Sequence, residues 1–148
     1  MFNSPPFGHT PAGGGRLEDN HRELREQIES FVDLRTARAH LAESMRGAGA
    51  QSLEIGDAEL VLTELASNSL RYSGEPVEFC LEWLDGSPVL HVWDCGDAFD
   101  WTPPRQEAAS ESGRGLFLVQ AIAQHFSVER ADERNHARAA LRPLRSPA

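Results

Sequence analysis

The sequence predicts an α+β fold in which helices pack on one face of a mixed, mostly antiparallel sheet. Two observations support this prediction. Apolar residues recur at helical spacing in some segments and alternate in others, and one Asp-Gly pair joins two alternating segments. The length of 148 residues is that of one domain. We therefore expect a domain over residues 20–148, after a disordered tail over residues 1–19 that is rich in proline and glycine.

The first part of this domain is predicted to form a strand and then two helices. A loose alternation marks a strand over residues 21–29, and helical spacing over residues 31–45 ends at two glycines. Asp57 is a plausible N-cap for the second helix, which closes at Ser73-Gly74. The side chains expected to face the core are Leu24, Ile28, Phe31, Leu34, Ala37, Leu41, Met45, Leu60, Val61, Leu65, Ser69 and Tyr72.

The second part is predicted to begin with a β-hairpin. Residues 77–83 and 89–93 alternate, and Asp85-Gly86 supplies the tight turn between them. A long polar loop follows over residues 94–113, and loops of this length in a compact domain are usually functional or mobile. The elements expected after the loop are a helix over residues 114–125 and strands over residues 126–130 and 136–141.

Composition excludes several classes of function. The 14 basic and 23 acidic residues give a net charge of −9, which argues against direct nucleic-acid binding. No apolar run approaches the roughly 20 residues of a membrane span, so we expect a cytoplasmic protein. All the basic residues are arginine, which excludes a lysine-dependent phosphate loop and Schiff-base chemistry. Cys80 and Cys95 are expected to be free thiols.

The first motif with chemical meaning is the pair Glu64 and Asn68. Residues four apart lie on one face of a helix, so a carboxylate and a carboxamide would lie side by side. Oxygen donors of this kind suit Mg²⁺, with water and phosphate as further ligands. The alternative is a solvated pair on an exposed helix face, which base rates alone would favour.

The second motif is Asp94-Cys95-Gly96, at the end of the returning hairpin strand. A carboxylate there can accept a hydrogen bond from an exocyclic amine, and a glycine lets the backbone approach a flat ring closely. Asp and Gly after a strand are also ordinary turn residues, so the motif alone is weak.

The third motif is Gly113-Arg114-Gly115-Leu116, between the long loop and the next helix. Glycines at a helix start expose N–H groups that can bind an anion, and Arg114 could add a bidentate phosphate contact. A flexible hinge before a helix is the alternative.

The order of the three motifs along the chain is more specific than any one motif alone. In this order, the chain resembles the ATPase domain of gyrase and histidine kinases, the GHKL or Bergerat-fold superfamily. More narrowly, ELVLTELASNSLRYSG, LHVWDCGDAF and GRGLFLVQAIAQHFSVE resemble the N, G1 and G2 boxes of small bacterial anti-sigma-factor serine kinases. The resemblance covers residues 30–142 and implies a Bergerat-type two-layer sandwich.

The resemblance also implies roles for individual residues. Asn68 would be the Mg²⁺ ligand, and Glu64 the general base. Asp94 would bind the adenine amino group of ATP, with Gly96 making room for the ring. The phosphates would lie at the hinge of a lid over residues 97–112. The residues implied there are Gly113, Arg114, Gly115 and Leu116, while Arg71 would face the phosphates or a partner, or simply solvent.

Two positions depart from the family pattern. Ala98 stands where the family has a second glycine in the G1 box. The late strand lacks the threonine that helps to hold adenine, and His136 is the nearest polar substitute that the sequence suggests. Both departures weaken the expectation of tight ATP binding more than that of the fold.

The resemblance implies an anti-sigma factor that uses Mg-ATP to phosphorylate a serine of a STAS-type anti-anti-sigma protein. Its partners would be that protein and a sigma factor, and a homodimer is allowed. The alternative is a catalytically inactive or nucleotide-insensitive module that sequesters a sigma factor or another regulator. Ala98 and the missing threonine favour the alternative, whereas Glu64 together with Asn68 favours a serine/threonine kinase.

Overall fold

The order of helices and strands is the predicted one. The computed structural model describes residues 24–73, 76–97 and 111–145, without the side chains of residues 111–114. The predicted tail over residues 1–19 and Ala98 lie outside these ranges. Within them, the elements are β1 (Leu24–Ile28), α1 (Phe31–Gly47), α2 (Ser52–Ser73), β2 (Val77–Leu84), β3 (Ser87–Asp94), α3 (Glu111–Ile122), β4 (His125–Ala131) and β5 (Arg134–Ala140).

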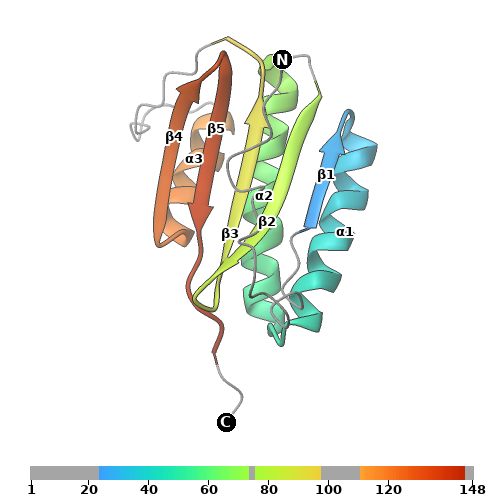
Figure 1. The fold of residues 1–148 in the computed structure, drawn as a ribbon, viewed down its shortest axis with the longest axis vertical. Helices are drawn as coiled ribbons and strands as arrows, with labels where there is room; N and C mark the ends of the chain where they lie inside the picture. Colours follow the sequence, from blue (N-terminus) through green and yellow to red (C-terminus); the bar gives the residue numbers. More distant parts are fainter. Residues whose placement is uncertain (1–23, 74–75, 98–110, 146–148) are drawn as a thin grey trace, which may run out of the picture.

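The strands form a sheet in the order β1-β2-β3-β5-β4. Every neighbouring pair among these strands is antiparallel, so the prediction of a mixed sheet is wrong for the described part of the chain. The three helices lie together on one face of the sheet (Figure 1). The α+β class and the two-layer arrangement are therefore confirmed.

The core lies between the sheet and the helix layer. Its largest fully buried side chains come from the three helices and from strands β1, β2 and β3, and include Phe79, Ile28, Leu41, Met45 and Leu62. The central helix α2 contacts both α1 and α3 and also packs on β2 and β3. This packing fixes one side of α2 against the end of β3, where the predicted site residues lie.

Helix α2 begins at Ser52, five residues before the predicted N-cap Asp57. The Glu54 carboxylate accepts a hydrogen bond from the Gln51 backbone N–H at 2.7 Å, so the helix start is capped upstream of Asp57. Gly56 then lies inside the helix, at a cost of about 1 kcal/mol relative to alanine. Two residues predicted to face the core are exposed: Phe31 at the start of α1 (57%) and Tyr72 near the end of α2 (61%).

Helix α3 begins at Glu111, three residues before the predicted start, and ends at Ile122 because β4 begins at His125. Gly113 and Gly115 therefore lie inside the helix and not ahead of it. N–H groups without an intrahelical acceptor occur only at the start of a helix, and within α3 they belong to residues 111–113. The prediction that both glycines expose N–H groups at a helix start is wrong for Gly115.

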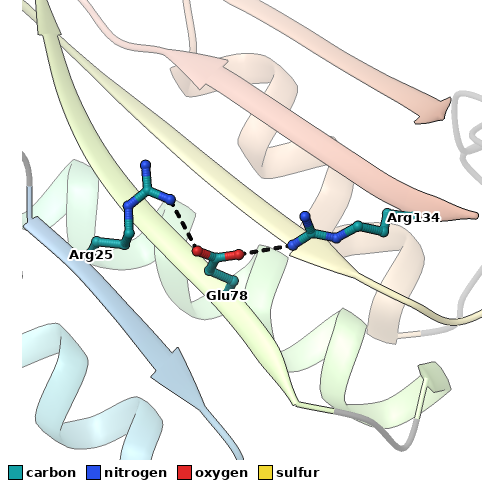
Figure 2. Close-up of polar contacts among 3 residues, drawn as sticks. All are labelled: Arg25, Glu78 and Arg134. Atoms are coloured by element: carbon teal, nitrogen blue, oxygen red, sulfur yellow. Dashed lines mark hydrogen bonds and ion pairs between the residues drawn. The ribbon is translucent and has the colours of Figure 1, made fainter. Parts of the chain in front are cut away.

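Polar and aromatic side chains cover the sheet face opposite the helices. Figure 2 shows the Glu78 carboxylate between two guanidinium groups, with Arg25 Nη1 at 3.1 Å and Arg134 Nη2 at 2.8 Å. The rings of His91, Trp93 and His136 stack in the same layer, with centroids 4.7–5.4 Å apart. This face is organised by side chains that come from four different strands.

The segment after β5 is hydrogen-bonded to the β2–β3 turn and to the start of α2. The Leu144 N–H donates to the Gly86 carbonyl at 3.2 Å, and the Arg145 N–H donates to Glu54 Oε2 at 2.9 Å. Within the described ranges, we find no helix with the length and apolar character that a membrane crossing needs. Cys80 is buried, Cys95 is exposed, and neither forms a disulfide.

Candidate functional site

A cleft of about 300 Å³ opens between α2, the start of α3 and strands β3, β4 and β5. This volume is at the lower end of the range for small-molecule sites. The apolar part of its wall is formed by Leu65, Val92, Leu116, Phe126, Val128 and Ala137. Its polar groups include Asn68 from α2, Asp94 from β3 and Asn135 from β5. An apolar wall with a few polar groups suits a flat ring that carries hydrogen-bonding atoms.

Helix α2 carries two predicted site residues, Glu64 and Asn68. Asn68 lines the cleft and is 9% exposed. Glu64 lies one turn earlier, is half-buried, and does not line the cleft itself. Asn68 is buried and Glu64 is half-buried against α3, so the two do not form a solvated pair on an exposed helix face.

The carboxylate of Glu64 lies directly against the backbone of Gly115 on α3. A Cβ atom added at Gly115 would overlap Glu64 Oε1 and lie 2.7 Å from Glu64 Cδ. Glycine at this position thus leaves free the space that the end of the Glu64 side chain occupies. The structure thus brings the first and third motifs together, with Leu116 in the wall of the adjoining cleft.

The second motif forms a hydrogen-bonded group at the end of β3. Asp94 Oδ1 accepts from the Gly96 backbone N–H at 2.9 Å and from Asn135 Nδ2 at 2.8 Å. The Asp94 side chain is buried at the cleft, so a carboxylate faces any ligand bound there. Within the described residues, no neighbour donates to the other oxygen, Oδ2, which can accept a hydrogen bond from a ligand.

Gly96 is required by the protein itself. A Cβ atom added at this residue would lie 2.7 Å from the Cβ and 2.9 Å from the Cα of Ser73, at the end of α2. Gly96 also lines the cleft. The close approach to Ser73 explains the glycine by packing, and room for a ligand ring remains a prediction.

The remaining predicted residues lie outside the cleft or outside the description. The Arg71 side chain is exposed and does not line the cleft, as the solvated interpretation expects. Gly113 and Arg114 belong to the first turn of α3, and the Arg114 side chain is not described. Most of the predicted lid over residues 97–112 is also outside the description.

Asn135 is the site residue that the sequence did not reveal. It pairs with Asp94 across β3 and β5, so its side chain lies on the same face as that carboxylate. His136 is the next residue on β5, so it points to the opposite face, where its ring stacks on Trp93. The suggestion that His136 replaces the missing threonine is therefore wrong, and the polar group at that place is Asn135.

The donor set fits a magnesium ion that is bound chiefly by its substrate. No group of three or more His, Cys, Asp and Glu side chains that could hold a metal occurs among the described residues. Mg²⁺ does not need such a cage, because it keeps several waters and takes phosphate oxygens as ligands. The Asn68 amide lines the cleft and has no hydrogen-bond partner in the described part of the chain. Its oxygen is thus available as a ligand.

Comparison with known proteins identifies the family of the chain. The family described as "Histidine kinase-like ATPase domain" matches residues 30–141, and the matched range contains Glu64, Asn68, Asp94 and Gly115. A comparison with curated proteins found no match. Because the family match covers most of the chain, from α1 to β5, the chain belongs to the family of histidine kinase-like ATPase domains, which are ATP-binding domains.

Proposed function

We propose that the chain is an anti-sigma factor that phosphorylates a serine of a STAS-type anti-anti-sigma protein with Mg-ATP. The observation that supports this most is the contact between Glu64 and Gly115 beside a cleft lined by Asn68 and Asp94. The roles proposed for these residues are proton acceptor for Glu64, Mg²⁺ ligand for Asn68 and adenine-binding carboxylate for Asp94.

The adenine ring is proposed to enter the cleft with its amino group at Asp94. Two protein donors already occupy Asp94 Oδ1, so the second oxygen accepts from the exocyclic amine. The apolar wall, with Val92 and Leu116 among its residues, then covers the faces of the ring. This arrangement orients the triphosphate away from β3 and along α2.

The triphosphate is proposed to lie between Asn68 and the first turn of α3. The free N–H groups at the start of α3 and the positive end of its helix dipole favour negatively charged phosphate. Asn68 would hold the Mg²⁺ ion, which supplies charge neutralisation on the phosphates.

Glu64 is proposed to accept the proton of the incoming serine. The serine Oγ attacks the γ-phosphorus, and the bond between that phosphorus and the β,γ-bridging oxygen breaks. ADP leaves with the electron pair, and the serine proton passes to the Glu64 carboxylate. Direct transfer of this kind needs no covalent enzyme intermediate.

The proposed partners follow from the family resemblance and from charge. The net charge of −9 suits a partner with a basic docking surface, such as a sigma factor. The serine-bearing protein must reach Glu64, which lies beside the cleft. A sequestering module without catalysis would need neither Glu64 at Gly115 nor an Asn68 amide that has no partner among the described residues.

The test separates nucleotide binding from phosphotransfer. Calorimetric titration of Asn68→Ala with Mg-ATP should show loss of binding with an unchanged thermal unfolding curve. Glu64→Gln should retain ATP binding but lose phosphotransfer to a co-encoded STAS-type protein by about 10²–10⁴-fold. Glu43→Gln, an exposed change on α1, is the matched control and should alter neither. Wild-type protein that binds ATP but transfers no phosphate would support the sequestering module instead.

A further inference from the structure

We infer that Asn135 is a positioning residue of the base site, which sets the selectivity for adenine by holding the Asp94 carboxylate in one orientation. This inference rests on the proposed nucleotide site. Asn135 is 7% exposed, lies at the start of β5, and pairs with Asp94 across the two strands. It therefore belongs to the rigid sheet, while its side chain faces the cleft.

The orientation of the Asn135 amide is fixed by its neighbours. Its Nδ2 donates to Asp94 Oδ1 at 2.8 Å and to the Asp97 carbonyl at 2.9 Å, while its Oδ1 accepts from Arg130 Nη1 at 3.0 Å. A flipped amide would place its oxygen against two acceptors and its nitrogen against a donor. Only one orientation therefore satisfies all three contacts.

The fixed Asn135 amide in turn fixes the orientation of the Asp94 carboxylate. Its Oδ1 receives one hydrogen bond from Asn135 and another from the Gly96 N–H, so the carboxylate cannot rotate without breaking both. Oδ2 then presents only acceptor lone pairs to the cleft. A purine with an amine at position 6 can donate to this oxygen, whereas a purine with a carbonyl there meets a second acceptor.

Asn135 acts through Asp94 and not on the ligand. Both of its N–H groups and its carbonyl oxygen are already engaged within the protein. Arg130 completes the arrangement, because the same Nη1 also donates to the Gly96 carbonyl at 2.8 Å. Strands β4 and β5 together hold the backbone of residues 96–97 in the position from which Gly96 donates to Asp94.

The experiment compares ATP with inosine triphosphate, whose base has a 6-carbonyl and an N1–H where adenine has a 6-amine and a bare N1. Dissociation constants of both nucleotides are measured by calorimetry for the full chain. The wild type should bind ATP tenfold or more tightly than inosine triphosphate, because loss of a hydrogen bond to a charged group raises a dissociation constant by about this factor. In Asn135→Ala, the ratio of the two constants should fall toward one because Asp94 can rotate.

Two further variants make the result interpretable. Glu54→Ala removes two hydrogen bonds at the opposite end of the domain and should weaken stability without changing the ratio. Asn135→Asp keeps the shape of the side chain but places a second carboxylate 2.8 Å from Asp94 Oδ1. The charged side chains in contact with it are Asp94 and Arg130, and the Asp97 backbone carbonyl also faces it. The ATP preference of this variant should therefore be lost at pH 8 and partly return at pH 5.5, as a shared proton restores a donor.

The outcomes distinguish the inference from the proposed function. If the wild type prefers ATP and Asn135→Ala keeps the same ratio, the positioning role is overturned while the nucleotide site stands. Should Asn135→Ala fail to fold, an Asn135→Asp protein with the wild-type ratio at pH 8 overturns the role equally. A wild type that binds neither nucleotide, or binds both equally, overturns the base site itself.

Discussion

The carboxylate of Glu64 on α2 occupies the space that a side chain at Gly115 on α3 would need. Two residues fifty-one positions apart in the sequence are thus mutually dependent: one supplies a charged group, and the other leaves room for it. A side chain added at Gly115 can therefore displace the Glu64 carboxylate, which the proposed chemistry needs. The helices can stay in place, because only the end of the Glu64 side chain has to move.

Gly115→Ala should retain the fold but lose phosphotransfer. The atoms that a new methyl group would meet belong to the flexible end of Glu64, which can rotate away at little cost. Alanine in a helix also stabilises by up to about 1 kcal/mol relative to glycine. We expect the free energy of unfolding to be unchanged or higher, and phosphotransfer to fall by about 10²-fold or more, as after loss of a general base. Urea denaturation and a phosphotransfer assay test both parts.

The matched control for this change is Gly56→Ala on α2. This glycine is exposed and helical, and a Cβ atom added there meets nothing within 4 Å. The control should gain the same helix stability and keep full phosphotransfer. Full activity in Gly115→Ala would show that the position of the Glu64 carboxylate is unimportant.

Gly96→Ala should behave differently, because its neighbour is backbone. A methyl group would lie 2.9 Å from Ser73 Cα, which cannot move without shifting the end of α2. We expect a loss of about 1–3 kcal/mol in the free energy of unfolding, as for other overpacked sites, together with weaker ATP binding. Gly47→Ala at the end of α1, where a Cβ atom meets nothing within 4 Å, should cause no such loss. Equal stability of the two variants would contradict the packing argument.

His91 and His136, on the sheet face opposite the helices, predict that the free energy of unfolding decreases at acidic pH. Burial, chiefly, lowers the pKa of both His91 and His136 to about 4 from an ordinary value of 6.5. His91 Nε2–H donates a hydrogen bond to the Glu82 carboxylate at 2.8 Å. Because a neutral ring has one donor and one acceptor nitrogen, His91 Nδ1 accepts a hydrogen bond from His136 Nε2–H, also at 2.8 Å. Both rings are therefore neutral in the folded protein at neutral pH.

The unfolded chain binds more protons than the folded one between pH about 6.5 and 4. The free energy of unfolding should therefore decrease as the pH is lowered through this range, by up to about 1.4 kcal/mol per pH unit for each histidine. His136→Gln keeps a donor for His91 and should reduce this slope, whereas the exposed His125→Gln should leave it unchanged. Identical slopes for wild type and His136→Gln, measured by urea denaturation at several pH values, would falsify the assignment.

The Glu78 carboxylate should contribute a modest, salt-dependent stabilisation. Each of its oxygens takes one guanidinium group, from Arg25 on β1 and from Arg134 on β5, but all three side chains are partly exposed (Figure 2). We expect Glu78→Gln to lower the free energy of unfolding by about 1 kcal/mol, and by less in 1 M salt. Glu43→Gln on α1 should have no measurable effect. A Glu78→Gln loss that does not change with salt would mean that packing, and not charge, holds this contact.

The sequence predicted the element order well because periodicity and turn chemistry are local signals. Asp85 and Gly86 both have positive φ, as the Asp-Gly hairpin signal predicts. Helix starts were less predictable. Capping of α2 through Glu54 involves a side chain and a backbone N–H that no apolar pattern marks, and the turn at Asp132-Glu133 adopts positive φ without a glycine.

The candidate site was only partly predictable for a different reason. Glu64, Asn68 and Asp94 belong to local motifs, and the structure brings them to one region. The importance of Asn135 depends on the register between β3 and β5, since a shift of one residue would place His136 opposite Asp94 instead. Likewise, the packing of Gly96 on Ser73 and of Gly115 on Glu64 exists only after the helices meet the sheet.

The anchoring of the chain after β5 has a practical consequence. Hydrogen bonds from Leu144 and Arg145 hold this segment beside the β2–β3 turn and the start of α2, at the opposite end of β3 from Asp94 (Figure 1). A fluorophore or affinity handle attached through a linker beyond Arg145 thus begins remote from the cleft. Immobilising the protein through that point keeps the surface away from the cleft in surface-based binding measurements.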